Sequence, residues 1–344
     1  MIAGFKVIAP GLFTTIQDRG RRGYQNIGVP VSGALDRIAL TLANGLAGNG
    51  ADAPALEMLV QGPTLEVVAA SVRVAVVGTE SVTIAGEASR TVPAGRSLLL
   101  MRGERISFGA FTGLGAYLAV EGGFAVQPVL GSAATYVRNR IGGIEGRTLQ
   151  VGDVLAVHAE AAAERAEVSL ASALEPGFDR PIRVVLGPQD NHFTEAAIEI
   201  FLSEPFVISR QADRMGFRLE GPKLTHRGDS NIVSDGIVAG AVQVPGSGQP
   251  IVLLADAQTA GGYPKIATVI SADIPLLVRR SPGRAVRFAA VTVEEAEGLR
   301  RAQEVELASA LGDLHPVEDG PVLSHEALHS ANLVGGVASA TEHD

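Results

Sequence analysis

The chain has 344 residues, a hydrophobic fraction of 46%, a net charge of −9 and no cysteine. Its length exceeds what one ordinary hydrophobic core needs, so two domains are expected, and the lack of cysteine excludes disulfides and thiolate metal sites. The negative charge argues against nucleic acid as a partner, because phosphate binding needs a concentrated basic surface.

No segment of the sequence has the roughly twenty consecutive apolar residues that cross a bilayer. The stretch 65–77 comes closest, but Glu66 and Arg73 interrupt it. The N-terminus also lacks the charged segment and sustained apolar run of a signal peptide. We therefore expect no membrane partner and a cytoplasmic location.

The first half of the chain is predicted to form short strands between glycine turns. Apolar residues from Leu35 to Leu46 recur at helical spacing, with Ser32 as the expected helix cap. Segments of strand length, rich in valine, isoleucine and leucine, follow at 72–77, 81–84, 97–101 and 116–120. The 41 glycines suit closely spaced turns that use positive φ angles. These features indicate a mainly β protein with a few helices.

An alanine- and glutamate-rich run over 159–181 is the expected domain boundary. It predicts an N-terminal domain over 1–175 and a C-terminal domain over 176–291. A C-terminal helix with a flexible tail is expected over 292–344.

The second half is expected to begin with a strand at 182–186, followed by a short helix capped by Thr194. Thr292 and Glu295 form a capping-box pattern that opens a longer helix, to about Leu311. The residues after Leu311 have no apolar periodicity and are expected to be mobile or loosely docked.

Polar side chains are concentrated at one strand–turn–strand junction in this second half. A strand at 251–255 ends in Asp256, and a second strand at 266–270 closes at Asp273. The turn between them carries Gln258, Thr259, Gly261, Gly262, Tyr263 and Lys265. Paired glycines allow a ligand or another backbone to approach without obstruction by a Cβ atom.

Lys265 is the first candidate catalytic residue. Lysine occurs only here, at Lys6 and at Lys223, among 28 basic residues, so a compact ammonium is indicated where arginine is the default cation. Asp256 and Asp273 are expected to lie close to it. Such a cluster is either a structural salt bridge or a charge-tuned acid–base site, and the simplest alternative is a surface lysine that starts a strand.

Gln258, Thr259 and Tyr263, together with Gln243 nearby, can hydrogen-bond a planar amide, ureido or lactam group. The alternative for Gln258 and Thr259 is that they satisfy backbone groups of the turn. Arg214 can bind a substrate carboxylate through two hydrogen bonds or form a salt bridge between domains.

Other motifs are absent or rejected. His325-Glu326-Ala327-Leu328-His329 has the zinc-protease spacing, but too little chain follows it to supply a third ligand, so no metal site is expected. The sequence contains no phosphate-binding loop, no dinucleotide fingerprint and no nucleophile elbow. The doublets Arg21-Arg22 and Arg279-Arg280 are interpreted as surface charge or anion contacts.

The order and spacing of several short motifs resemble the biotin-dependent carboxyltransferase-like family, also labelled allophanate hydrolase subunit 2 or KipA. The motifs include Gln17-Asp18-Arg19-Gly20, Gly142-Gly143-Ile144-Glu145-Gly146, Gly187-Pro188-Gln189, Asp213-Arg214-Met215-Gly216, Ser234-Asp235-Gly236 and the block 251–270. Ala260 departs from the family's usual threonine, and Arg279-Arg280 from a frequent glutamine, which leaves the substrate open.

The resemblance implies two cyclophilin-like β-barrel domains and a role as one subunit of an ATP-dependent 5-oxoprolinase, which opens 5-oxo-L-proline to L-glutamate. The implied partners are the KipI-like and LamB/YcsF-like subunits of that enzyme, with ATP bound by the complex. Lys265 and Arg214 would stabilise negative charge, Asp256 would act as base or orient the attacking water, and Gln258 and Thr259 would position the lactam. The alternatives are the carboxyltransferase part of a biotin-dependent urea carboxylase and a regulatory KipA-type partner of a KipI-like protein.

Overall fold

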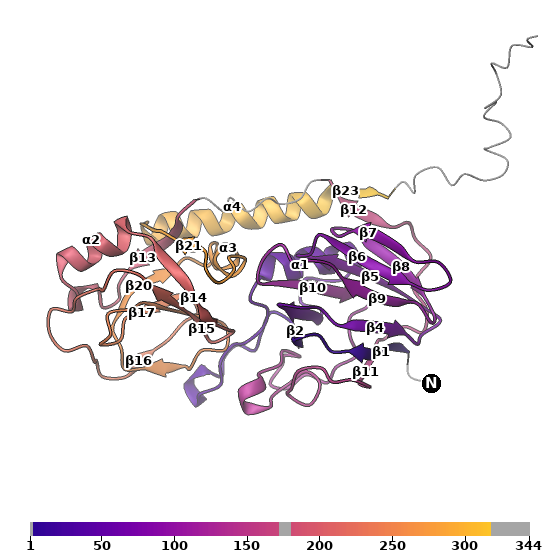
Figure 1. Ribbon diagram of the computed structural model, residues 1–344, viewed down its shortest axis with the longest axis horizontal. Helices are drawn as coiled ribbons and strands as arrows, with labels where there is room; N and C mark the ends of the chain where they lie inside the picture. The colour runs from indigo at the N-terminus through magenta and orange to yellow at the C-terminus, as the bar shows by residue number, and fades with distance from the viewer. Residues whose placement is uncertain (1–2, 172–179, 318–344) are drawn as a thin grey trace, which may run out of the picture.

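The computed structural model describes residues 3–171 and 180–317 and confirms that the chain is mainly β, with few helices (Figure 1). The strands form two groups, one in each half of the sequence, and helix α4 (Val293–Gly312) runs along both groups. The expected boundary between residues 175 and 176 lies outside the described residues, as do His325 and His329.

Two antiparallel sheets make up the N-terminal half. The first has the strand order β11 (Val154–Ala156), β1 (Gly4–Ala9), β4 (Thr64–Val67), β9 (Arg105–Phe108), β6 (Ser81–Ala85) and β7 (Arg90–Pro93). The second has the order β2 (Phe13–Gln17), β3 (Ala55–Leu59), β10 (Gly115–Val120), β5 (Ser71–Val77) and β8 (Ser97–Met101). One apolar core contains residues of both sheets, such as Phe5 and Ile84 from the first and Met58 and Leu118 from the second. The four strands predicted in this half are therefore confirmed.

Helix α1 (Arg37–Ala47) covers the other face of the second sheet. Its Leu40 and Leu46 belong to a cluster that includes Ala75 of β5 and Ala119 of β10. Alanine on the strands leaves room for the helix to approach closely. Because both faces of this sheet are covered, its central strands are apolar at nearly every position.

The cap of α1 differs from the prediction. The Asp36 carboxylate accepts a hydrogen bond from the N–H of Ala39 at 2.9 Å, whereas Ser32 was the expected cap. The prediction was wrong because the helix begins at Arg37, one full turn after Ser32, and an aspartate is an equally good cap at the true position.

The C-terminal half is built on one eight-stranded sheet. Its order is β21 (Ala285–Val286), β14 (Phe206–Ala212), β15 (Gly216–Glu220), β18 (Ile251–Leu253), β17 (Ala241–Gln243), β20 (Lys265–Val269), β13 (Ile182–Leu186) and β22 (Phe288–Ala290). The two edge strands, β21 and β22, are separated in sequence only by Arg287, so the sheet nearly closes into a barrel. A small separate ladder joins β16 (Asp235–Gly236) to β19 (Ala260–Gly261).

The helices of this half follow the predicted caps, with one addition. Thr194 caps α2 (Glu195–Ser203), and Thr292 and Glu295 form the expected capping box of α4. Helix α3 (Ile274–Val278) was not anticipated. Short 3₁₀ turns occur at 25–27, 137–139 and 190–192. None of the helices in the described ranges is long and apolar enough to cross a bilayer.

Two segments that were expected to be irregular pair with each other. Strand β12 (Val168–Leu170), within the boundary run, is antiparallel to β23 (Leu314–Pro316), which follows α4. Leu170 and Leu314 also pack against the cluster beneath α1. The expectation of loose docking after Leu311 is therefore wrong for β23, which returns the chain from the C-terminal half to the N-terminal one; residues 318–344 lie outside the described residues.

Overpacking the contact between α1 and the sheet should destabilise the protein. Ala119→Leu places three additional carbon atoms in a closed space, and we expect a loss of roughly 1–3 kcal/mol of unfolding free energy, measured by urea denaturation. Ala302→Leu, at an exposed position of α4, is the matched control and should change stability by less than about 0.5 kcal/mol. An unchanged urea midpoint for Ala119→Leu would show that α1 does not pack tightly on the sheet.

Candidate functional site

A buried arginine joins the two halves of the molecule. Arg214, in the turn between β14 and β15, is 4% exposed. Its Nε and Nη2 donate to the two carboxylate oxygens of Asp256 at 2.7 and 3.0 Å, and Nη1 pairs with Glu57 on β3 of the N-terminal half. Nη2 also donates to the carbonyl of Gly33 at 2.8 Å. Of the two interpretations of Arg214, the structure shows the salt bridge between the halves.

The same network continues into the N-terminal half. Glu57 is fully buried and also accepts hydrogen bonds from the Tyr117 hydroxyl and, at 2.8 Å, from the N–H of Leu35. Burial lowers the pKa of Arg214, but the carboxylates of Glu57 and Asp256 outweigh this, and the net pKa is raised. Burial, reinforced by Glu57, raises the pKa of Tyr117. The arginine and the hydroxyl therefore both stay protonated at neutral pH.

The arginine doublets were expected to be surface charge or anion contacts, and the expectation of surface charge holds for Arg22 alone. Arg21 is 1% exposed, and its Nη2 binds the carbonyl of Ala134. Arg279 forms an ion pair with Asp36 across the two halves, and Arg280 is buried. Only Arg22 is an exposed residue. The prediction of surface charge failed because the buried arginines are paired with residues far away in the chain, which a local sequence pattern does not reveal.

Lys265 has a different carboxylate partner from the two that were expected. Its ammonium donates to Asp235 Oδ2 at 2.8 Å and to the carbonyl of Gly236 at 3.3 Å. Asp256 instead binds Arg214, so the expected cluster of Lys265 between Asp256 and Asp273 was wrong. The lysine is also buried, with 3% of its surface exposed, which excludes the interpretation as a surface lysine.

The carboxylate of Asp235 is partly exposed, and the buried Lys265 fixes it in place. Half of its side chain, 51%, is accessible, and Gln189 Nε2 donates to the same oxygen as Lys265 at 3.1 Å. The hydrogen bond from Lys265 is the main cause that holds the pKa of Asp235 below its usual value. The carboxylate is therefore ionised and fixed in direction, as a hydrogen-bond acceptor for a ligand must be.

Two polar side chains without a hydrogen bond in the described ranges precede β19, the strand that pairs with Asp235. Asp235 and Gly261 are register partners in the ladder of β16 and β19, and the N–H of Ile237 donates to the carbonyl of Thr259 at 3.0 Å. Gln258 is exposed and Thr259 half-buried, and neither side chain makes a hydrogen bond within the described part of the chain. The alternative that both side chains satisfy the backbone of the turn is therefore not what the structure shows.

Gly261 is required by a close approach rather than by an unusual backbone angle. A Cβ atom at this position would lie 2.7 Å from Gln243 Nε2 and 2.7 Å from a methyl carbon of Ile237. Gln243 is buried and donates to the carbonyl of Tyr263 at 3.4 Å. Gly262, by contrast, has ordinary space around it. Gly261 and Gln243 together hold the turn, and Tyr263 stays exposed beside it.

Asp273 is placed away from Lys265 by its own contacts. The carboxylate is fully buried and accepts hydrogen bonds from Arg180 at 2.8 and 2.9 Å and from the side chain of Arg183 at 2.6 and 3.0 Å. These bonds occupy both oxygens, so the geometry disfavours the predicted role of Asp273 in substrate binding. No group of metal-ligating side chains occurs within residues 3–171 and 180–317.

The residues that sequence reasoning missed are Asp235, Gln189, Glu57 and Arg21. Asp235 and Gln189 stand in two of the motifs that carried the family resemblance, Ser234-Asp235-Gly236 and Gly187-Pro188-Gln189. Their positions within these two motifs were the feature of the sequence from which a functional role could have been suspected. Their proximity to Lys265 was hidden because it arises from sheet pairing across dozens of residues.

The family model for the carboxyltransferase domain, subdomain A and B, matches residues 27–290. The chain belongs to this family. It is 38% identical over 304 residues to the C subunit of 5-oxoprolinase from Escherichia coli strain K12, covering 87% of this chain and 95% of that protein. The corresponding protein of Haemophilus influenzae is 37% identical over 299 residues, or 85% of this chain and 93% of that one.

Larger proteins contain the same domain. Urea amidolyase of Saccharomyces cerevisiae is 31% identical over 327 residues, which cover 89% of this chain but only 18% of that protein. Among solved structures, the urea amidolyase of K. lactis superposes with a TM-score of 0.82 at 29% identity, covering 90% of this chain and 20% of that one. The predicted family and the mainly β fold are thus confirmed.

The buried Asp273 should make stability depend on acidity. Burial raises its pKa, but the hydrogen bonds of Arg183 and Arg180 outweigh this and lower the net pKa below the 3.8 of an ordinary aspartate. A depressed pKa stabilises the folded state above the unfolded value of about 3.9, and this stabilisation is lost as the pH falls through the folded pKa. Urea unfolding between about pH 6 and pH 2 should therefore show a smaller acid-induced loss in Asp273→Asn than in the wild type.

The control for this measurement is Asp229→Asn, at an exposed position of the same half. It should keep the wild-type pH profile. Parallel profiles for the wild type and Asp273→Asn would show that Asp273 does not contribute to the acid sensitivity.

Proposed function

We propose that the chain is one subunit of an ATP-dependent 5-oxoprolinase complex that hydrolyses 5-oxo-L-proline to L-glutamate. It is, in this proposal, part of a hydrolase that acts on a cyclic amide and is active only when assembled. The two named relatives that this chain matches over nearly their whole length are C subunits of 5-oxoprolinase. This end-to-end match distinguishes them from urea amidolyase, of which the domain is a small part.

The observation that carries the proposal is the oriented carboxylate of Asp235, on the strand whose pairing partner directly follows Gln258 and Thr259 in the chain. A lactam presents one N–H and one carbonyl oxygen in a planar group. Asp235 suits the N–H as an acceptor, while the Gln258 amide and the Thr259 hydroxyl can donate to the carbonyl. In hydrolysis, the oxygen of water bonds to the carbonyl carbon, the ring C–N bond breaks, and the departing nitrogen takes up a proton. The site can hold the lactam for that attack.

Lys265 is assigned as a positioning residue, since its buried ammonium reaches the ligand through Asp235. Its positive charge also lowers the cost of negative charge that develops nearby. Arg214 and Asp256 are assigned to holding the two halves together, since Arg214 binds Asp256 within its own half and Glu57 and Gly33 of the other half. We therefore revise their proposed catalytic roles.

In this proposal, ATP is bound by the assembled complex, and the partners are its other subunits. The sequence has no phosphate-binding loop, so ATP is not assigned to a particular chain of the complex. The KipI-like and LamB/YcsF-like subunits are the proposed partners. Exposed apolar side chains flank the site: Val233 is 92% exposed, Val238 56% and Tyr263 42%. Exposed apolar residues beside a polar site suit a surface that a partner covers.

A second candidate function is the carboxyltransferase component of a biotin-dependent urea or amide carboxylase. The TM-score of 0.82 to urea amidolyase favours it. Urea offers the same planar N–H and carbonyl pattern as a lactam. Biotin would then come from a carrier on another chain. The third candidate, a regulatory KipA-type partner of a KipI-like protein, would need no catalytic side chains.

The isolated chain should not turn over 5-oxoproline, because it lacks a phosphate-binding loop. ATP-dependent glutamate release should appear when the KipI-like and LamB/YcsF-like subunits are added to it. Robust turnover by the lone chain would contradict its assignment to a multi-subunit enzyme. Loss of carboxybiotin that depends on urea, without glutamate release, would support the second function instead.

Removing the buried charge should lower the activity of the assembled complex. Lys265→Met frees Asp235, and we expect kcat to fall by about a hundredfold, as for one lost charge-stabilising group. Asp235→Asn should raise KM at least as much as it lowers kcat, since it removes a contact with the substrate itself. Thermal unfolding of each variant checks that the fold is kept.

Lys223→Met is the matched control, because Lys223 is an exposed lysine of the same half. It should retain the wild-type rate. Wild-type kinetics in both Lys265→Met and Asp235→Asn would leave the strand–turn–strand block with an architectural role only.

A further inference from the structure

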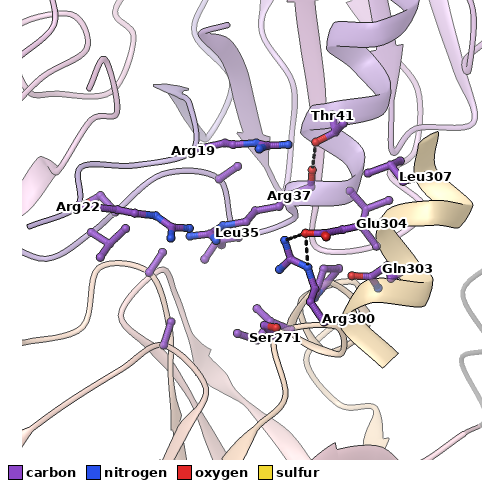
Figure 2. A pocket seen from close by; sticks show the side chains of 18 of the residues that line it. Arg19, Arg22, Leu35, Arg37, Thr41, Ser271, Arg300, Gln303, Glu304 and Leu307 are labelled. Carbon is purple, nitrogen blue, oxygen red and sulfur yellow. Dashed lines mark hydrogen bonds and ion pairs between the residues drawn. The ribbon is translucent and has the colours of Figure 1, made fainter. Parts of the chain in front are cut away.

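A cavity of about 370 Å³ lies between the two halves and α4. Figure 2 shows side chains that line it from the N-terminal segment, from α1 and from α4. Its charged residues are Arg19, Arg22, Arg37, Arg300 and Glu304. Four guanidiniums line it against one carboxylate, and Asp52 pairs with Arg19 from outside the lining, so two net positive charges remain in a protein whose total charge is −9.

Two of these arginines are already paired and two are not. Arg19 binds Asp52 at 3.2 Å, and Arg300 binds Glu304 on the same helix at 2.6 Å. The guanidiniums of Arg22 and Arg37 form no hydrogen bond or ion pair with any residue of the described ranges. Positive charges that lie close together without a negatively charged protein partner repel one another, and the fold must overcome this repulsion.

Arg37 stands at an unfavourable position for a cation. It is the first residue of α1, where the helix dipole favours negative charge. The carboxylate of its neighbour Asp36 already caps the helix and pairs with Arg279. Burial lowers the pKa of Arg37, and the other three arginines of the cavity lower it further. An anion beside Arg37 would relieve each of these costs.

The rest of the lining is largely apolar. Leu35, Ile38, Ile274, Pro275 and Leu307 contribute to the wall. The volume of about 370 Å³ lies within the range of small-molecule sites, roughly 300–1,000 Å³. The cavity is thus suited to a small molecule with a multiply charged end and a less polar body.

We propose that this cavity binds a small molecule through a phosphate group that carries two or more negative charges. Arginine forms paired hydrogen bonds with phosphate oxygens, and the two net positive charges of Arg22 and Arg37 suit a phosphate better than a single carboxylate. The site is separate from the Lys265–Asp235 pair, and the proposal does not depend on the function proposed above.

The test is isothermal titration of the purified full chain at low ionic strength with tripolyphosphate, ATP and citrate. Tripolyphosphate should bind saturably, and added sodium chloride should weaken it. Citrate, a carboxylate of similar charge, should bind more weakly. ATP binding as tight as that of tripolyphosphate identifies a nucleotide as the natural source of the phosphate, while tripolyphosphate binding alone identifies another phosphate compound.

Arg37→Gln should weaken tripolyphosphate binding by roughly tenfold or more, the usual effect of losing a charge-assisted hydrogen bond. Arg22→Gln should weaken it as well. Because neither guanidinium has a partner in the described ranges, both variants should keep the thermal unfolding midpoint of the wild type. Arg301→Gln is the matched control, since Arg301 neighbours Arg300 but pairs with Glu297 outside this cavity. The proposal is overturned by an absence of saturable binding, by tighter binding of citrate, or by equal losses in Arg37→Gln and Arg301→Gln.

Discussion

The structure depends on one buried guanidinium that carries the contact between its halves. Arg214 reaches from the C-terminal sheet into the N-terminal one, where Glu57 is fully buried. Charges in the protein interior are costly unless they are paired, and removing one partner of a buried pair typically costs about 3–5 kcal/mol. Glu57 of the N-terminal half is therefore neutralised by an arginine of the C-terminal half, which Asp256 holds in place. This requirement fixes how the halves meet more strictly than apolar contact alone, since apolar burial has no preferred direction.

The geometry of both candidate sites depends on this contact. The arginine-lined cavity takes its walls from the two halves and from α4, so it exists only when they are in register. Asp256, which binds Arg214, lies at the start of the polar turn that leads to Gln258 and Thr259. The exposed acceptor Asp235 is in turn fixed by Lys265 and Gln189. A rigid frame of buried charges thus supports a surface whose hydrogen-bonding groups are free, which is the arrangement that ligand binding requires.

Local features were predictable from the sequence, and long-range pairings were not. The strand at 72–77 and the caps at Thr194 and Thr292 follow from short patterns, because side-chain periodicity and capping act within one turn or strand. The partner of Lys265 did not follow, since Asp235 precedes it by thirty residues and reaches it through the ladder of β16 and β19. The burial of Arg21 was equally hidden, because nothing in a run of charged residues says which one a distant loop will cover. The family motifs contained Asp235 and Gln189 but not their roles.

A double-mutant cycle between Glu57 and Arg214 tests the central claim most directly. Unfolding free energies of the wild type, Glu57→Gln, Arg214→Met and the double variant would be measured by urea denaturation with calorimetry. If the buried pair couples the two halves, the coupling energy exceeds about 1 kcal/mol, as residues within one buried network show, and both halves of the wild type unfold in one transition. Additivity within about 0.3 kcal/mol, with two separate transitions in the wild type, would contradict it.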